Sequence, residues 1–292
     1  MASAKGLHLT LVVSRVFNAF LCFTSILLNI ITIQALRKTS SLPKTLKTLL
    51  LSLAVSDLGV GLLVQPLYVA ILLMEIDQNT NSTAYNSVYK PYEIQKKIFV
   101  LASHYGVFAL TFDRFLAIRL HLRYQELVTH KRVVAAVISI WVFSAPVSFL
   151  RQLYDSLIMG AVILVVCVII KGLLYCKIHA AVRHHRHQIR ALQVQQELQN
   201  GEKAVSAERL RKSALTTFYV YVVYLVCYLP ISCVVFAKTN GETVLLSHLC
   251  YFTWTLVYLN SSLNPLIYCW KMRHIRQTVM DILRNVIAIS QH

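Results

Sequence analysis

The sequence predicts an all-α membrane protein, a bundle of seven transmembrane helices followed by a short amphipathic eighth helix. Of its 292 residues, 57% are hydrophobic and only 14% are charged, whereas soluble domains are about 45–50% apolar and about 25% charged. A water-soluble fold could not hide this much apolar surface, so we expect lipid around the chain. Seven apolar blocks are long enough to span about 30 Å of hydrocarbon. We expect a single domain, residues 1–292, with spans near 10–36, 46–75, 92–120, 132–151, 156–180, 213–237 and 245–270.

The basic residues predict the orientation of these spans. The formal net charge is +17, and 21 of the 29 Lys and Arg residues fall in 37–47, 114–132, 177–212 and 271–284. Basic loops stay on the cytoplasmic side, so we expect the N-terminus outside, the C-terminus inside and a multi-pass protein of the plasma membrane. Because this charge lies between apolar blocks, it does not indicate nucleic-acid binding. The first block, about 25 residues long, exceeds a signal-peptide core and should target the chain itself.

Three segments outside the spans have distinct patterns. Residues 271–284 alternate basic and apolar side chains as an amphipathic helix on the inner membrane surface would. The run His184–His187 opens the longest polar loop and is interpreted as a solvated extension of a helix rather than a metal site. The outer loop near 76–91 contains Asn81-Ser82-Thr83, an N-glycosylation acceptor. The same pattern at Asn260 lies within a span and should not be glycosylated.

Asp57 is predicted to lie midway through the second span, where an ionisable group is energetically costly and therefore a candidate functional residue. Its partners must come from other helices. Oxygen ligands around one carboxylate suit a hard monovalent cation or ordered water, and an interhelical hydrogen-bond cluster that only joins the helices is the alternative. The candidates at similar depth are Asn29, Ser103, Asn260, Ser261 and Asn264.

Charged residues also occur at both ends of the third span. Asp113 and Arg114 lie at its inner end and can form an ion pair with each other. Near its outer end, three- and four-residue spacing places Lys96 and Lys97 beside Glu93 on one helix face. The three residues could bind a polar ligand, or they could form a satisfied ion pair. Elsewhere, Lys171 lies about two turns inside the fifth span and is expected to extend toward the cytoplasm.

In this order and at these depths, the motifs resemble those of the rhodopsin-like (class A) G-protein-coupled receptors from Asn29 to about Arg276. Pro265, which follows Asn264, removes a helix hydrogen bond and permits a kink. The motifs are Asn29, Leu53-Ala54-Val55-Ser56-Asp57, Asp113-Arg114-Phe115, Leu122-Arg123-Tyr124, Trp141, Cys227-Tyr228-Leu229-Pro230 and Asn264-Pro265-Leu266-Ile267-Tyr268.

The resemblance implies roles for these positions. The Asp57 group resembles the family's sodium pocket, which makes a bound sodium ion the only cofactor or metal expected. Asp113, Arg114 and Phe115 resemble the G-protein-coupling motif, and Tyr175 and Tyr268 the tyrosines that stabilise the active state. Tyr228 and Pro230 resemble the toggle and hinge below the ligand pocket. The resemblance further implies a small extracellular ligand, a heterotrimeric G protein and arrestin as partners within the lipid bilayer.

Departures from the family pattern indicate which branch of the family the chain resembles. The family's cysteine 25 residues before Arg114 is replaced by Tyr89, its proline eight residues before Tyr175 by Cys167, and the second outer loop is very short. Together these features are similar to the melanocortin, lysophospholipid, cannabinoid and adenosine receptors. Lys96 replaces the aspartate of amine receptors, and Tyr258 replaces the lysine of opsins.

The sequence therefore predicts a receptor without catalytic residues that passes an extracellular signal to a G protein. Its ligand could be a melanocortin-like peptide, a lipid or a nucleoside, and Lys96 and Lys97 favour an anionic one. The alternatives are a transporter or channel, which would require inverted repeats or a continuous polar path, and a binding receptor that does not signal.

Overall fold

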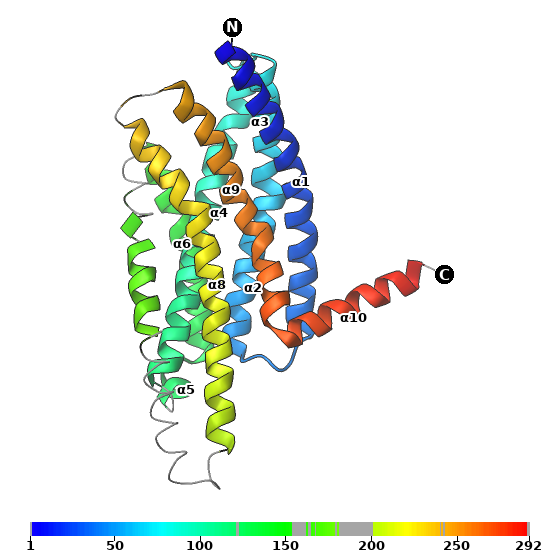
Figure 1. Ribbon diagram of the computed structural model, residues 1–292, viewed down its shortest axis with the longest axis vertical. Coiled ribbons are helices and arrows are strands. Elements are labelled where there is room, and N and C mark those ends of the chain that lie inside the picture. Colours follow the sequence, from blue (N-terminus) through cyan, green and yellow to red (C-terminus); the bar gives the residue numbers. More distant parts are fainter. Residues whose placement is uncertain are drawn as a thin grey trace.

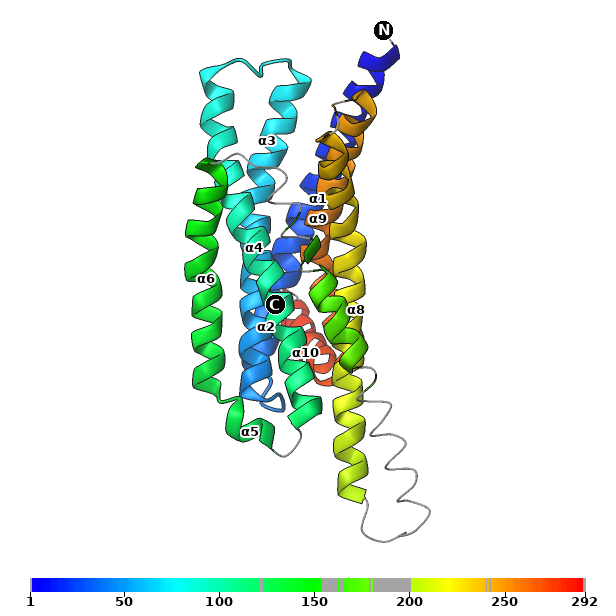
Figure 2. The same ribbon diagram turned by 90° about the vertical axis from the view of Figure 1, so that its left-hand side faces the viewer.

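The computed structural model describes residues 2–120, 123–153, 162, 165–166, 168–178, 180, 201–239, 241 and 243–290. All regular elements in these residues are helices, and the long ones run side by side as a bundle (Figure 1). Figure 2 shows the same bundle from the side, with α9 (Val244–Lys271) beside both α1 (Ala2–Lys38) and α8 (Gly201–Lys238). The expected all-helical fold is confirmed, and the pairing of α1 with α9 closes the bundle.

The bundle buries polar as well as apolar groups, and large apolar side chains are exposed on its outside. Phe20, Phe23, Phe143 and Phe236 are each more than 60% exposed, whereas Asp57 is fully buried. By length and composition, four described segments could each cross a membrane: Gly6–Lys38, Lys44–Ile76, His130–Phe149 and Phe218–Lys238. This distribution is what lipid as the surrounding solvent requires.

The second span is continuous but changes its helical geometry midway. It runs through α2 (Lys44–Gly59), a π-helical turn η1 (Val60–Val64) and α3 (Gln65–Ile76). Pro66 at the start of α3 has no backbone N–H, and its ring would clash with a carbonyl one turn earlier in a regular α-helix. A π turn is a common way to absorb such a disturbance. Just before it, Gly59 lets α4 approach, since a Cβ there would overlap the Phe99 ring.

The third span begins earlier than its hydropathy predicts. The helix α4 covers Thr83–Leu120, so most of the predicted outer loop at 76–91 is helical and only residues 77–82 connect α3 to α4. The hydroxyl of Ser82 accepts a hydrogen bond from the Tyr85 N–H (3.0 Å), a typical N-cap. Tyr85 stacks on Tyr89 at 5.6 Å between ring centroids, which stabilises the extra turns. The loop prediction was therefore wrong because the helix extends past its apolar portion.

The remaining helices follow the predicted order. The short helix α5 (Tyr124–Leu127) precedes α6 (His130–Leu153), and the described positions between 162 and 180 are helical. The helix α8 begins twelve residues before the predicted start at 213, and Thr243 caps α9 by accepting from the Leu246 N–H (3.2 Å). The predictions for His184–His187 and Cys167 lie outside the described residues.

The predicted amphipathic helix is α10 (Arg273–Ser290), which leaves the bundle sideways (Figure 1). Ile275 and Ile282 are buried, and Arg273, Arg276 and Arg284 are exposed. This separation of apolar and basic faces suits a helix lying along a membrane surface.

Candidate functional site

A buried polar cluster joins α1, α2 and α9 around Asp57. The amide of Asn264 donates a hydrogen bond to Oδ2 of Asp57 (2.7 Å). Asn29 of α1 donates to the backbone carbonyl of Ser261 (2.9 Å), and the hydroxyl of Ser25 donates to the Asp57 carbonyl (3.1 Å). Sequence reasoning found every member except Ser25, a small residue with no signal beyond its position one turn before Asn29.

Several polar atoms of this cluster have no hydrogen-bond partner among the described residues. They are Asp57 Oδ1, Asn264 Oδ1, Asn29 Oδ1, Ser103 Oγ and both amide atoms of Asn260. Leaving a buried polar atom unsatisfied costs about 1–3 kcal/mol. All but one of these atoms are oxygens, the ligands that a hard cation prefers. The donor set therefore fits a sodium ion or ordered water. The described residues contain no group of three or more His, Cys, Asp or Glu that could hold a transition metal.

Near the end of α4 that the sequence predicts to be cytoplasmic, Arg114 is paired with its neighbour Asp113. Its Nε donates to Oδ2 of Asp113 (2.9 Å), its Nη2 forms an ion pair with the same oxygen, and both residues are buried. Tyr124 of α5 donates to the other Asp113 oxygen (2.6 Å). Burial, together with this hydrogen bond, raises the pKa of Tyr124 to about 12. The carboxylate thus restrains Arg114, which the sequence predicted, while the role of Tyr124 became visible only in three dimensions.

The other predicted activation residues are Phe115, Tyr175 and Tyr268. Phe115 packs against Ile118 and Ile178. Tyr175 stacks on Tyr221 of α8 at 4.8 Å between ring centroids. The hydroxyls of Tyr175 and Tyr268 are buried without a hydrogen-bond partner in the described part of the chain.

The predicted toggle and hinge residues lie within α8 and α9. Tyr228 is 3% exposed and stacks on Tyr224 at 4.4 Å between ring centroids. Pro230 lies two residues later inside α8, and Pro265 lies inside α9 next to Asn264. Both prolines remove a helix hydrogen bond, so each helix can bend beside a buried functional side chain.

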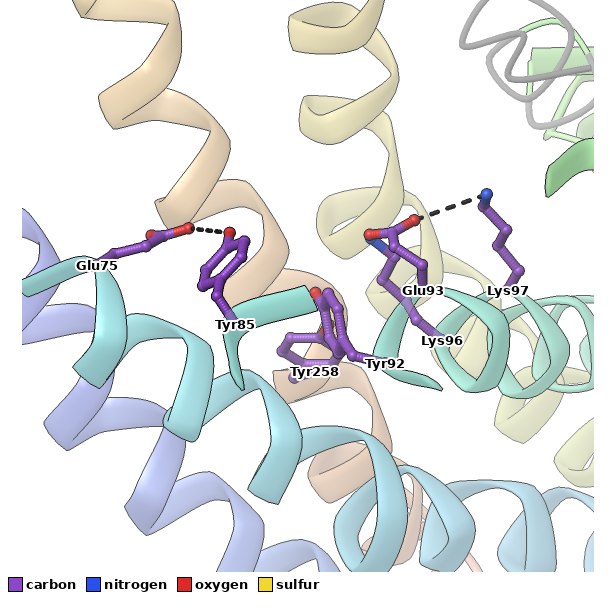
Figure 3. A network of polar contacts seen from close by, with 7 residues as sticks. All are labelled: Glu75, Tyr85, Tyr92, Glu93, Lys96, Lys97 and Tyr258. Carbon is purple, nitrogen blue, oxygen red and sulfur yellow. Dashed lines mark hydrogen bonds and ion pairs between the residues drawn. The ribbon is translucent and has the colours of Figure 1, made fainter. Parts of the chain in front are cut away.

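At the ends of α3, α4 and α9 that the sequence predicts to be extracellular lies a group that we call the outer cluster: Glu75, Tyr85, Tyr92, Glu93, Lys96, Lys97, Tyr251, Trp254 and Tyr258. Figure 3 shows its members except Tyr251 and Trp254. Lys96 forms an ion pair with Glu93. Its Nζ also lies 4.6 Å from the ring centroid of Tyr92 and 4.3 Å from that of Trp254. Lys97 Nζ is 3.6 Å from Glu93 Oε2. The ion pair that the sequence left as one alternative is thus present.

Tyrosines complete the outer cluster. Glu75 accepts hydrogen bonds from Tyr85 of α4 (3.1 Å) and Tyr251 of α9 (2.9 Å). The hydroxyls of Tyr92 and Tyr258 are 2.8 Å apart. Sequence reasoning missed Glu75 and the tyrosines as site residues, because aromatic side chains scattered through apolar blocks are mostly core or lipid-facing.

Two further predictions concern exposure. Asn81 is exposed in the turn between α3 and α4, whereas Asn260 is 1% exposed.

The expectation that Lys171 extends toward the cytoplasm is wrong, because Lys171 is fully buried and its Nζ lies 3.6 Å from the ring centroid of Tyr224. The residue is on the face of its helix that turns toward α8.

The comparisons with known proteins agree with this arrangement. The model of the family described as 7 transmembrane receptor (rhodopsin family) matches residues 28–157 and 151–268. The chain therefore belongs to the rhodopsin family of seven-transmembrane receptors, which makes it a multi-pass membrane protein and a G-protein-coupled receptor rather than an enzyme. The match selects the receptor class over the transporter or channel that the sequence left open.

Particular relatives fall in the predicted branch. The chain is 25% identical to melanocortin receptor 4 of Danio rerio, over 96% of this chain and 86% of that receptor. It is 23% identical to adenosine receptor A2b of Gallus gallus, over 94% of this chain and 88% of that receptor. Identity to melanocortin receptor 3 of Rattus norvegicus is 24%, over 89% and 81%. At the position of the family's outer cysteine, Tyr89 contributes to an aromatic stack with Tyr85.

Proposed function

We propose that this receptor resides in the plasma membrane with its N-terminus outside, and that an extracellular ligand at the outer cluster displaces the inner part of α8 outward. The observation that carries the proposal is that α4 bears both ends of the path, with Lys96 in the outer cluster and Arg114 in the inner ion pair. Eighteen residues separate them in the sequence, which is about 27 Å along a helix.

Arg114 is the residue that would engage the heterotrimeric G protein. In the described arrangement the guanidinium of Arg114 is hydrogen-bonded to Asp113, and Tyr124 donates a hydrogen bond to the same carboxylate. Outward movement of α8 would open the space beside Arg114, and Tyr175 and Tyr268 would offer it hydroxyl partners. Ligand binding needs only to favour this state over the resting one. Arrestin would dock on the same basic inner surface after activation.

A sodium ion at Asp57 would favour the resting state. The fit rests on the Asp57 oxygen and the neighbouring amide and hydroxyl oxygens that have no partner among the described residues. A cation there would neutralise a carboxylate buried between α2 and α9, and it would hold both helices in one arrangement.

The ligand is proposed to be anionic, because a negative group can replace Glu93 as the partner of Lys96 and Lys97. Each of Lys96→Ala and Lys97→Ala should lower ligand potency about tenfold or more, since a charge-assisted contact contributes about 1.5–3 kcal/mol. The measurement is a second-messenger response to a panel that contains an anionic lysolipid, an uncharged nucleoside and a cationic peptide.

The matched control for this experiment is Lys90→Ala, a change at an exposed lysine of the same helix. The potency of the panel member that activates the receptor should be unaffected by Lys90→Ala. Unchanged potency in both Lys96→Ala and Lys97→Ala would contradict an anionic ligand, as would activation by the cationic peptide alone.

Asn81 is proposed to carry an N-linked glycan, because its side chain is exposed in a turn that would lie outside the cell in the proposed orientation. In mammalian cells, treatment with peptide N-glycosidase F should increase the mobility of the wild-type receptor on a denaturing gel. Asn81→Gln and Thr83→Ala should both migrate at the treated position without the enzyme. A wild-type band that the enzyme leaves unchanged would count against the glycan.

A further inference from the structure

A lysine lies inside the apolar bundle, between the outer cluster and the Arg114 ion pair. Lys171 belongs to the helical segment 168–178, is fully buried, and places its Nζ 3.6 Å from the ring centroid of Tyr224 on α8. A charged side chain at membrane depth is costly and marks a functional position by default. A cation over an aromatic ring is attracted most strongly where water is excluded.

Tyr224 also contacts α4. Its hydroxyl is hydrogen-bonded to Nδ1 of His104, and the His104 ring meets the Tyr224 ring edge-on at 5.1 Å. Tyr224 is fully buried and His104 is 2% exposed. Tyr224 also stacks on Tyr228, the proposed toggle. One ring of α8 is therefore bound by two basic side chains that come from two other helices.

The position of this group suggests its effect. Tyr224 lies six residues before Pro230 on α8, and His104 lies ten residues before Arg114 on α4. The group is thus on the inner side of the hinge, in the part of α8 that the proposed movement displaces. Hydrogen bonds and cation–π contacts are both stronger where water is excluded, so both contacts of Tyr224 oppose separation of α8 from its neighbours.

We propose that Lys171 and His104 are positioning residues that together clamp Tyr224 and so hold α8 in the resting receptor. We call the three residues the Tyr224 clasp. The proposal rests on the outward movement of α8 proposed above and adds the contacts that oppose it. Signalling would require the ring of Tyr224 to leave the Lys171 ammonium and the His104 imidazole.

The test compares Lys171→Met with the wild-type receptor reconstituted in lipid nanodiscs without ligand. Spin labels at Arg119→Cys on α4 and Ser213→Cys on α8, in a background without reactive cysteines, report the separation of the two helices. Methionine keeps the length of the side chain but removes its charge. Lys171→Met should increase the population with the longer separation about tenfold, because a desolvated cation–π contact is lost from the resting state alone. Basal nucleotide exchange on the G protein should rise with it.

Two further variants distinguish a positioning role of the clasp residues from a role in packing alone. Lys171→Arg keeps a cation over the Tyr224 ring and should restore the wild-type distance distribution. Tyr224→Phe keeps the ring for Lys171 but loses the hydroxyl for His104, so it should produce an intermediate increase. If Lys171→Met gives no folded receptor, Tyr224→Phe provides the test, and a wild-type distance distribution in it would overturn the clasp.

Lys271→Met is the matched control, because Lys271 also lies over aromatic rings, with its Nζ 3.9 Å from the Tyr219 centroid and 3.4 Å from the Trp270 centroid. That group is partly exposed at the inner edge of the bundle. Tyr219 also lies on α8, but because this contact is partly exposed, its loss should shift the distance distribution much less than Lys171→Met does. A wild-type distribution in Lys171→Met, or an equal shift in Lys271→Met, would overturn the clasp while leaving the proposed function intact. An open α8 that fails to activate the G protein would instead count against the proposed function.

Discussion

Replacing Arg114 with alanine is expected to abolish activation of the G protein while leaving the receptor folded and at the cell surface. The guanidinium is buried in its pair with Asp113 and is the proposed contact of the G protein. Loss of one partner of a buried, hydrogen-bonded charge pair costs about 2–5 kcal/mol at an interface. That cost corresponds to a loss of about thirtyfold or more in activation, measured as guanine-nucleotide exchange in membranes with matched receptor levels.

The control for this prediction is Arg119→Ala, a change at an exposed arginine of the same helix. Its effect on exchange should be small, because most residues at the periphery of an interface contribute little binding energy. Full exchange by Arg114→Ala, or an equal loss in both variants, would show that Arg114 does not have the proposed role.

Sodium is expected to stabilise the wild-type receptor and to have no effect on Asp57→Asn. At a concentration ten times its Kd, a ligand adds about 1.4 kcal/mol of stability. For a chain of this size each kcal/mol shifts Tm by about 2–4 °C, so sodium chloride should raise Tm by about 3 °C relative to choline chloride. In Asp57→Asn, the amide that replaces the carboxylate no longer attracts a cation, and the two salts should give the same Tm.

Glu75→Gln is the matched control for the sodium experiment, because Glu75 is a second carboxylate on the same span, partly buried and 18 residues from Asp57 in the sequence. This variant should keep the sodium-dependent gain. Loss of the sodium-dependent gain in Tm in Glu75→Gln, or its persistence in Asp57→Asn, would show that sodium binds elsewhere.

The all-helical fold was predictable from hydropathy because the apolar runs are long and one face of each helix contacts lipid. Hydropathy could not predict where α4 and α8 begin, since both continue past the apolar region as polar helix. The N-cap at Ser82 was the signal in the sequence that could have corrected the start of α4. The π turn before Pro66 depends on backbone geometry that no pattern of residue types specifies.

Some features of the candidate site were likewise predictable from the sequence, and others were not. Asp57 and Arg114 were predictable because a charge at membrane depth is conspicuous. The environment of Lys171 was not, because hydropathy gives the depth of a residue and not the helix face on which it lies. Its contact with Tyr224 joins positions 53 residues apart in the sequence. The contacts of Lys96 with the rings of Tyr92 and Trp254 likewise depend on where α9 lies relative to α4.

The most direct test of the central claim is nucleotide exchange by the wild-type receptor itself. Membranes that contain the receptor would be combined with purified heterotrimers of each Gα class, and uptake of a non-hydrolysable GTP analogue would be measured without ligand and with each member of the ligand panel. We predict faster uptake on at least one heterotrimer than in membranes without receptor, and loss of that excess in Arg114→Ala. Uptake equal to that of receptor-free membranes on every heterotrimer, with folded receptor at the surface and every ligand class present, would contradict the account.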